Sequence, residues 1–183
     1  GNSRTPFKLI NEPDEEGRDK VKSMIDTYKK TGLDCLVVAG GNGSHKTANL
    51  LREKGLNVVT LPKTIDNDIN GTEMTFGFQS AMDIATKTLE QLHTTAKTHK
   101  RIIIDEIMGN KAGWLTLYSG LAGEADIILI PEIPYSIDKV EQFINKKLKE
   151  GRRQIMIAAA EGIISQEEAK LSKKELKKKR KEE

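Results

Sequence analysis

The stretch that decides the fold is an apolar run that ends in a glycine-rich turn, Leu33-Asp34-Cys35-Leu36-Val37-Val38-Ala39-Gly40-Gly41-Asn42-Gly43-Ser44. A nearly unbroken apolar run is typical of a strand that is covered on both faces. The glycines at its end allow a sharp turn. A helical pattern follows from His45 to Lys54 and is closed by Gly55. The sequence therefore predicts a strand, a tight turn and a helix in direct succession.

The same alternation of strand and helix continues on both sides of this stretch. Four further apolar strands are expected, at residues 57–61, 101–105, 126–130 and 154–160. Apolar residues at helical spacing predict helices at residues 14–31, 75–98, 111–122 and 136–150. Such a pattern predicts an α/β protein, an open three-layer sandwich with a mostly parallel sheet.

Details of the helices complete this prediction. Ser136 is placed to cap the helix that follows it, and Ser165 with Glu168 forms a capping box for a last helix. Ile84 is expected on the buried side of its helix, and Trp114 in the core. We expect residues 1–164 to form one α/β domain and residues 165–183 a charged helical tail or the start of a connection to a further domain.

Composition narrows the functional classes. The 183 residues are 37% hydrophobic and 31% charged, and no apolar run approaches the roughly 20 residues that span a bilayer. The single cysteine, Cys35, suits a small core residue in a reducing compartment, so we expect a cytoplasmic protein without a membrane partner. The net charge of +3 is concentrated at residues 170–181, which leaves the body near neutral and gives no indication of nucleic-acid binding.

Unusual loops directly follow every predicted strand. They lie at residues 40–44, 63–68, 108–110, 131–134 and 161–162. In open α/β sheets, ligands bind beyond the carboxyl ends of the strands. We therefore expect these loops on one rim of the sheet.

The most unusual loop is Leu61-Pro62-Lys63-Thr64-Ile65-Asp66-Asn67-Asp68-Ile69. One of its two aspartates could take a proton from a hydroxyl nucleophile while the other holds a divalent metal. Lys63 suits an anionic substrate. The alternative is a solvated turn, since asparagine and aspartate are common turn formers.

The glycine-rich turn at residues 40–44 joins a strand to a helix. A ligand can approach a glycine backbone closely, and the free amides at a helix N-terminus suit phosphate. The pattern is neither the P-loop nor the spaced dinucleotide motif. A tight turn without a ligand is the alternative.

Together, the two loops resemble the phosphofructokinase family, whose first loop is usually Gly-Gly-Asp-Gly-Ser and whose second is Thr-Ile-Asp-Asn-Asp. The second is intact at residues 64–68. The resemblance covers nearly the whole chain, because four further segments match in kind and order: residues 1–7, Met108-Gly109, Pro131-Glu132 and Ala160-Glu161-Gly162.

The resemblance implies a glycolytic kinase that converts fructose 6-phosphate to fructose 1,6-bisphosphate with ATP and Mg²⁺. It implies that Asp66 is the base that accepts the proton of the hydroxyl, in agreement with the chemistry of phosphoryl transfer. The resemblance implies substrate contacts from Thr64, Asp66, Arg101, Met108, Gly109, Asn110 and Glu161. It implies donor contacts from Arg4, Gly41, Asn42, Gly43, Ser44 and Lys63, and metal contacts from Asp68 and residue 42.

The resemblance also implies a role for Arg101 between subunits, and it implies which segments of the family this chain lacks. Arg101 matches an arginine that reaches the 6-phosphate in a neighbouring subunit, so a homo-oligomer is expected; a solvated charge is the alternative. By comparison with the family, the chain lacks the first strand with its donor loop and most of a second domain. We therefore expect an internal fragment that is inactive by itself.

Two positions depart from the family pattern. Asn42 stands where the family has aspartate, and an amide lacks the negative charge that a metal prefers. Asn110 stands where the family has arginine, and it cannot stabilise phosphate charge as a guanidinium does.

Two other positions bear on the phosphoryl donor. In the family, glycine at position 43 is found in ATP-dependent enzymes, whereas lysine at position 63 occurs in pyrophosphate-dependent enzymes and in some ATP-dependent ones. The alternatives are thus a pyrophosphate-dependent enzyme, a noncatalytic sugar-phosphate-binding or regulatory subunit, or a kinase of another type.

Overall fold

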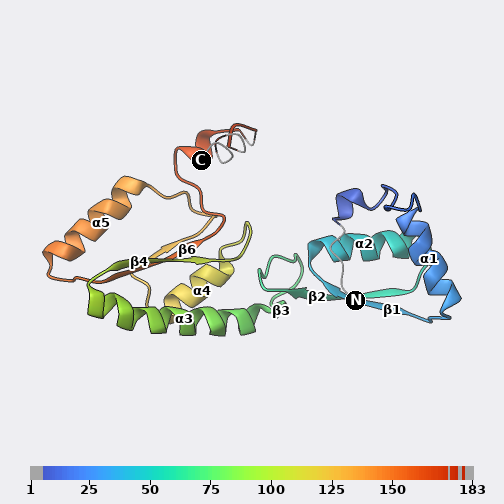
Figure 1. Ribbon diagram of the computed structural model, residues 1–183, viewed down its shortest axis with the longest axis horizontal. Helices are drawn as coiled ribbons and strands as arrows, with labels where there is room; N and C mark the ends of the chain where they lie inside the picture. The colour runs from blue at the N-terminus through green and yellow to red at the C-terminus, as the bar shows by residue number, and fades with distance from the viewer. Residues whose placement is uncertain (1–5, 173, 177–178, 180–183) are drawn as a thin grey trace. The chain divides into compact units, whose positions relative to one another are not determined.

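The computed structural model describes residues 6–172, 174–176 and 179 (Figure 1). The chain forms two compact units. The first contains the residues up to Thr64 together with Asp68–Phe76, and the second contains Ile65–Asn67 and the residues from Gly77 onward. The loop Thr64–Asp68 therefore contributes residues to both units.

The first unit is built on a sheet with the strand order β1-β2-β3, namely Leu36–Gly40, Val58–Thr64 and Phe76–Gly77. Strands β1 and β2 run parallel, with Gly40 opposite Pro62. A short 3-10 helix, Phe7–Leu9, precedes α1 (Lys20–Lys30) and α2 (Asn42–Glu53). Parallel pairing places the ends of β1 and β2 at the same edge of the sheet.

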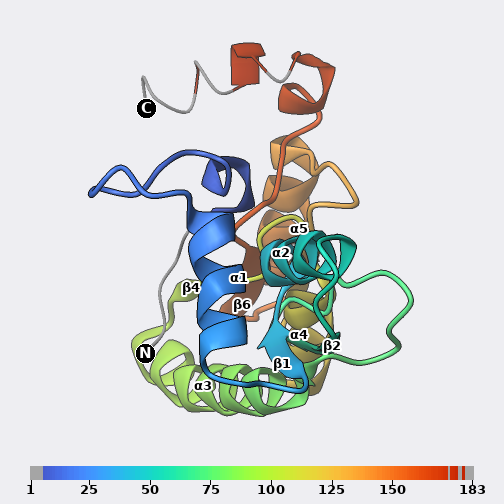
Figure 2. The same cartoon turned by 90° about the vertical axis from the view of Figure 1, so that its right-hand side faces the viewer.

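The helices of the first unit lie on one face of its sheet (Figures 1 and 2). A hydrophobic cluster of this unit contains the buried Ile10, Val21, Leu51 and Leu56, to which α1 contributes Val21 and α2 contributes Leu51. On the opposite face, Val37 and Val59 remain 60% and 50% exposed. In the described residues this unit is thus two-layered.

The second unit has the strand order β4-β6-β5, namely Ile102–Ile107, Ile155–Ala160 and Ile127–Leu129, and all its pairs are parallel. Helices α3 (Phe78–His99) and α4 (Trp114–Ala122) cover one face, and α5 (Ile137–Lys149) covers the other (Figure 1). All six residues of the central strand β6 are buried. This unit has the three layers that the sequence predicts.

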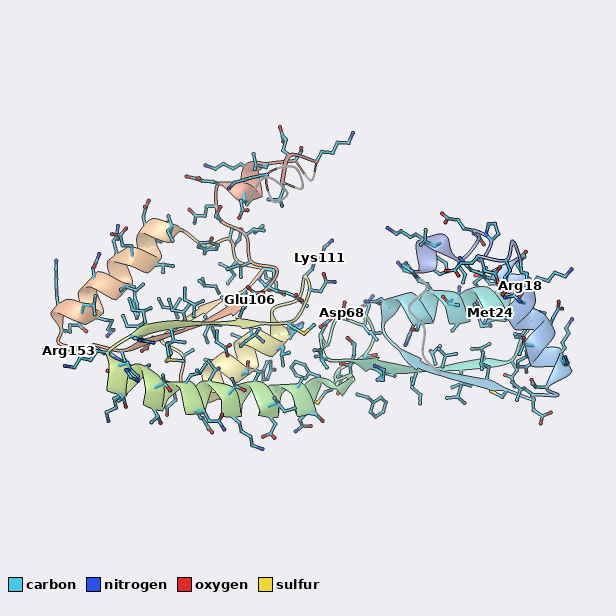
Figure 3. All side chains as sticks on the ribbon, viewed as in Figure 1. Arg18, Met24, Asp68, Glu106, Lys111 and Arg153 are labelled. Atoms are coloured by element: carbon cyan, nitrogen blue, oxygen red, sulfur yellow. The ribbon has the colours of Figure 1, made fainter. Side chains whose placement is uncertain are left out.

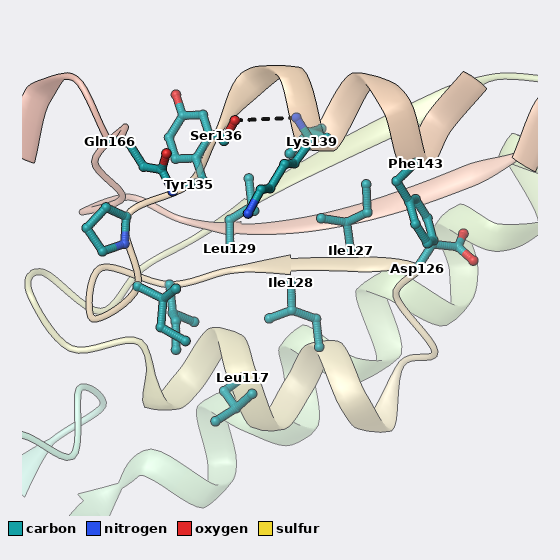
Figure 4. Close-up of a pocket in the computed structure, with 14 residues that line it drawn as sticks. Leu117, Asp126, Ile127, Ile128, Leu129, Tyr135, Ser136, Lys139, Phe143 and Gln166 are labelled. Carbon is teal, nitrogen blue, oxygen red and sulfur yellow. Dashed lines mark hydrogen bonds between the residues drawn. The ribbon is translucent and has the colours of Figure 1, made fainter. Parts of the chain in front are cut away.

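Helix α5 begins as predicted, with the hydroxyl of Ser136 accepting from the amide of Lys139 at 3.4 Å (Figure 4). It covers β5 loosely, because none of its residues is fully buried. A mostly apolar cavity of about 510 Å³ is lined by both elements. None of the residues predicted for the functional site lines this cavity.

The α/β class and the parallel strands are confirmed, but several boundaries were wrong. The strands form two three-stranded sheets, and β3 was not predicted because two residues carry no periodic signal. Helix α1 begins at Lys20 rather than residue 14, because Asp19 caps it by accepting from the amide of Lys22 at 3.0 Å. The residues from Asp14 to Arg18 form a turn instead.

Two predicted core residues are exposed. Ile84 in α3 is 66% exposed, because it lies five residues before the buried Leu89 and so about 140° around the helix from it. Trp114 is 45% exposed at the first turn of α4, where its ring lies 6.2 Å from that of Tyr118.

The predicted capping box near the C-terminus is confirmed by reciprocal hydrogen bonds between Ser165 and Glu168. The element that it starts is the short 3-10 helix Glu168–Lys170. Ser172 and Glu175 form a second reciprocal pair, which the sequence analysis missed. None of the helices in the described part of the chain has the length and apolarity of a membrane span.

Asp105 on β4 gives a prediction about stability. It alternates with Ile103 and Ile107, which pack into the core, and burial raises the pKa of its carboxyl above 3.8. The folded state therefore holds this proton more tightly than the unfolded chain, so the free energy of unfolding falls as pH rises through the folded pKa. Asp105→Asn is expected to have a higher urea midpoint than the wild type at neutral pH.

The difference between the two urea midpoints is expected to shrink as the pH falls below 3.8, because the Asp105 carboxyl then becomes protonated in both the folded and the unfolded wild type. Denaturation curves of the full-length protein across this range provide the measurement. A difference that does not change with pH would show that the Asp105 carboxyl does not contribute through its ionisation.

Candidate active site

The first group of predicted site residues lies where β1 leads into α2. The helix begins at Asn42 rather than at the predicted His45, so Asn42, Gly43 and Ser44 form its first turn. Gly41 is the N-cap and provides no side-chain hydrogen bond. The first amides of a helix carry a partial positive charge and suit an anion. The turn predicted to bind phosphate is therefore the N-terminus of a 12-residue helix.

The end of β2 lies beside this turn. Lys63 and Thr64 belong to the strand, which corrects their predicted place in a loop. A Cβ atom added to Gly41 would lie 3.8 Å from Cβ of Thr64 and 3.9 Å from the carbonyl oxygen of Lys63. The expectation that these two loops share a rim is confirmed within the first unit.

Asn42 has a direct partner in the second loop. Its amide nitrogen donates to the Asp68 carboxylate at 3.0 Å and to the Asp68 carbonyl oxygen at 3.3 Å. Figure 3 marks Asp68 in the loop that follows β2. A neutral amide avoids the repulsion that a second carboxylate would meet here.

The hydrogen-bonded residues Asn42 and Asp68 also bear on metal binding at this site. Within the described residues, no group of three or more aspartate, glutamate, histidine or cysteine side chains is placed to hold an ion. Mg²⁺ commonly binds one or two carboxylates together with substrate phosphates and water. Asp68 therefore suits a metal carried by a phosphate ligand, whereas the two residues do not suit a metal resident in the free protein.

The loop Thr64–Asp68 continues into the second unit. The Thr64 carbonyl accepts from the hydroxyl of the buried Thr75 at 2.8 Å, which fixes the end of β2. Ile65 packs against the core of the second unit. Asn67 has a φ of 52°, a conformation that asparagine adopts more readily than most residues. The half-buried Asp66 is thus held between two fixed neighbours in the chain.

The second group of predicted residues gathers where β4 and β6 end. Ile107 and Ala160 are paired, so Met108 and Glu161 follow adjacent strand ends. One carboxylate oxygen of Glu161 accepts from the amides of Gly109 at 3.0 Å and Asn110 at 2.6 Å. Glu161 therefore binds the backbone of the segment in which Gly109 and Asn110 were predicted to contact a sugar.

A third strand end contributes a residue that the sequence analysis did not assign to the site. Glu132 follows β5, and its carboxylate accepts from the amide of Gly113 at 2.8 Å. Gly113 is the N-cap of α4. The available signal was the position of an acidic residue in the loop that follows a parallel strand, at the same sheet edge as Glu161.

Two predicted residues are not brought into these groups. Arg101 is exposed immediately before β4, at the opposite end of that strand from Met108. Six strand residues separate them, which corresponds to roughly 20 Å. Arg4 lies outside the described residues.

Comparison with known proteins assigns the family. The Phosphofructokinase family model matches residues 5–183. The chain belongs to the phosphofructokinase family. Among solved structures, it resembles phosphofructokinase from Saccharomyces cerevisiae with a TM-score of 0.79 and 28% identity, covering 97% of this chain and 26% of that one. Pichia pastoris phosphofructokinase in the T-state gives a TM-score of 0.75 and 31% identity, covering 97% of this chain and 21% of that one.

Curated members of the family are more similar in sequence. The ATP-dependent 6-phosphofructokinase of Spirochaeta thermophila is 54% identical over 176 residues, which are 94% of this chain and 48% of that protein. ATP-dependent 6-phosphofructokinase 3 of Bacteroides thetaiotaomicron is 49% identical over 147 residues, which are 80% of this chain and 44% of that protein. The chain thus spans about half the length of these phosphofructokinases.

Proposed function

We propose that the full-length protein is an ATP-dependent 6-phosphofructokinase of glycolysis, which transfers a phosphoryl group from ATP to the 1-hydroxyl of fructose 6-phosphate. The observation that carries this proposal is the N-terminus of α2 lying against the end of β2, directly before Asp66. The α2 turn suits a phosphate, and Asp66, two residues after the end of β2 in the sequence, is a carboxylate that suits the role of base. The relatives described above are named ATP-dependent, which supports ATP as the donor.

The donor phosphates are assigned to the α2 turn. The amides of Gly41, Asn42, Gly43 and Ser44 would bind them, with Lys63 and Arg4 adding positive charge. A Cβ atom at Gly43 would meet no atom within 4 Å, so this side of the turn leaves room for a nucleotide. When bound to the donor, Mg²⁺ supplies neutralisation of the phosphate charge, and Asp68 is the residue that would hold it.

The acceptor is assigned mainly to residues of the second unit, together with Thr64. Met108, Gly109 and Asn110 would line the sugar site, Glu161 would accept from sugar hydroxyls, and Thr64 would lie against the sugar phosphate. The oxygen of the 1-hydroxyl bonds to the transferred phosphorus and gives its proton to Asp66. At the same time, the bond between this phosphorus and the donor's bridging oxygen breaks. Arg101 would reach the 6-phosphate in a neighbouring subunit, which requires a homo-oligomer. We place this activity in the cytoplasm.

Asn110 favours a second candidate function. Its neutral side chain provides no positive charge where a cation would stabilise phosphate, and its backbone amide is already bound to Glu161. A sugar-phosphate-binding subunit that does not turn over is consistent with this observation.

The test is steady-state phosphorylation of fructose 6-phosphate by the full-length protein, with Mg-ATP and Mg-pyrophosphate in parallel. We expect turnover with ATP and a much lower kcat/KM with pyrophosphate. A preference for pyrophosphate would overturn the donor assignment. Binding of fructose 6-phosphate in calorimetry without turnover from either donor would replace the enzyme proposal with the noncatalytic one.

A further inference from the structure

The segment that joins β4 to α4, residues 109–113, is held by carboxylates from two neighbouring strand ends. Four of its five amides have acceptors: Glu161 binds those of Gly109 and Asn110, Glu132 binds that of Gly113, and the Gly109 carbonyl accepts from Ala112 at 2.9 Å. Both ends of the segment are thus fixed by charged acceptors, which form stronger hydrogen bonds than neutral ones. Lys111, at its middle, points outward from the fold (Figure 3).

Gly113 packs closely against Ile130 and Glu132. A Cβ atom there would lie 2.5 Å from Cβ of Ile130 and 2.6 Å from the second carboxylate oxygen of Glu132. Because Gly113 has no side chain to cap α4, its helix N-terminus depends on a residue from another element. A negative charge at this position also interacts favourably with the helix dipole. Glu132 therefore fixes both the start of α4 and the end of the segment.

The two carboxylates have different access to a ligand. Glu161 directly follows the strand end next to Met108, where the acceptor is assigned. Glu132 instead reaches the far end of the segment, three residues after Asn110. Its effect on a ligand at Met108–Asn110 must pass through the backbone between them.

We propose that Glu132 is a positioning residue for the sugar phosphate: by binding the Gly113 amide, it sets the backbone of residues 109–113 and hence the affinity for the acceptor. This inference rests on the proposed function. A positioning role differs from a purely structural role, because it predicts a change in the KM for fructose 6-phosphate without a change in the KM for ATP. Loss of correctly folded enzyme would lower kcat and leave both KM values unchanged.

The experiment compares Glu132→Ala and Glu132→Gln with the wild-type full-length protein. Glu132→Ala is expected to raise the KM for fructose 6-phosphate roughly tenfold, the effect of losing one charge-assisted hydrogen bond, with the KM for ATP unchanged. Glu132→Gln keeps an acceptor oxygen and is expected to restore most of the affinity. Glu141→Ala, at an exposed position of α5, is the matched control and is expected to behave as the wild type.

Hydrogen–deuterium exchange without substrate supplies an independent measurement. In Glu132→Ala, a peptide covering residues 109–116 is expected to exchange faster, while peptides from β1 and α2 are unchanged. An unchanged KM for fructose 6-phosphate in an active Glu132→Ala variant would overturn the inference alone. Equal effects on both substrates would assign Glu132 a structural role. A wild-type protein that neither binds nor phosphorylates fructose 6-phosphate would overturn the proposed function and this inference together.

Discussion

Asp66→Asn is expected to lower kcat for fructose 6-phosphate phosphorylation by about 10²–10⁴-fold, the usual contribution of a general base. The substitution keeps the size and shape of the side chain but removes its ability to accept a proton. Asp66 is half-buried and lies between Ile65, which packs into a core, and Asn67, which takes a left-handed conformation. Because the surrounding backbone is fixed by its neighbours, we expect little change in the KM of either substrate. Steady-state kinetics of the full-length protein provide the measurement.

Asp83→Asn is the matched control for this substitution. Asp83 is an exposed aspartate on α3 that pairs with Lys87 at 2.7 Å, and its loss is expected to leave kcat unchanged. A variant Asp66→Asn that retains wild-type kcat would show that the proton goes elsewhere. A fall in kcat/KM caused only by a higher KM would assign Asp66 to substrate binding instead.

Gly162→Ala is expected to give the second large effect. A Cβ atom at Gly162 would collide with the carbonyl oxygen of Asn110 and would lie 3.2 Å from Cγ of Pro131. The loops that follow β4, β5 and β6 meet at this point, and a backbone carbonyl cannot move aside as a flexible side chain can. Overpacking of this kind lowers the free energy of unfolding by about 1–3 kcal/mol.

The same substitution is expected to raise the KM for fructose 6-phosphate, because the displaced carbonyl belongs to the segment held by Glu161. Urea denaturation and steady-state kinetics measure the two effects. Gly43→Ala is the control for stability, since a Cβ atom there meets nothing within 4 Å and alanine favours a helix. Equal stability of the wild type and Gly162→Ala would mean that the close approach to Asn110 is not retained in solution.

The sequence by itself determined the class of fold and several of the residues that gather at the strand ends. Apolar runs such as residues 155–160 identify buried parallel strands, because both faces of such strands are covered. Parallel pairing then places the residues after each strand on a common rim, which is why Gly41 and Thr64 could be predicted as neighbours without coordinates. The intact Thr64–Asp68 loop carried the family resemblance because its five residues are consecutive in the sequence and can be recognised without coordinates.

Only the tertiary structure decided which partners these residues have. The start of α2 at Asn42 depends on backbone geometry that glycine and asparagine do not specify locally. The bond between Asn42 and Asp68 spans 26 positions, and that between Gly109 and Glu161 spans 52. A sequence pattern does not encode which carboxylate oxygen reaches which amide, because strand register and loop path fix that geometry. For this reason Glu132 became a site residue only when its contact with Gly113 was observed.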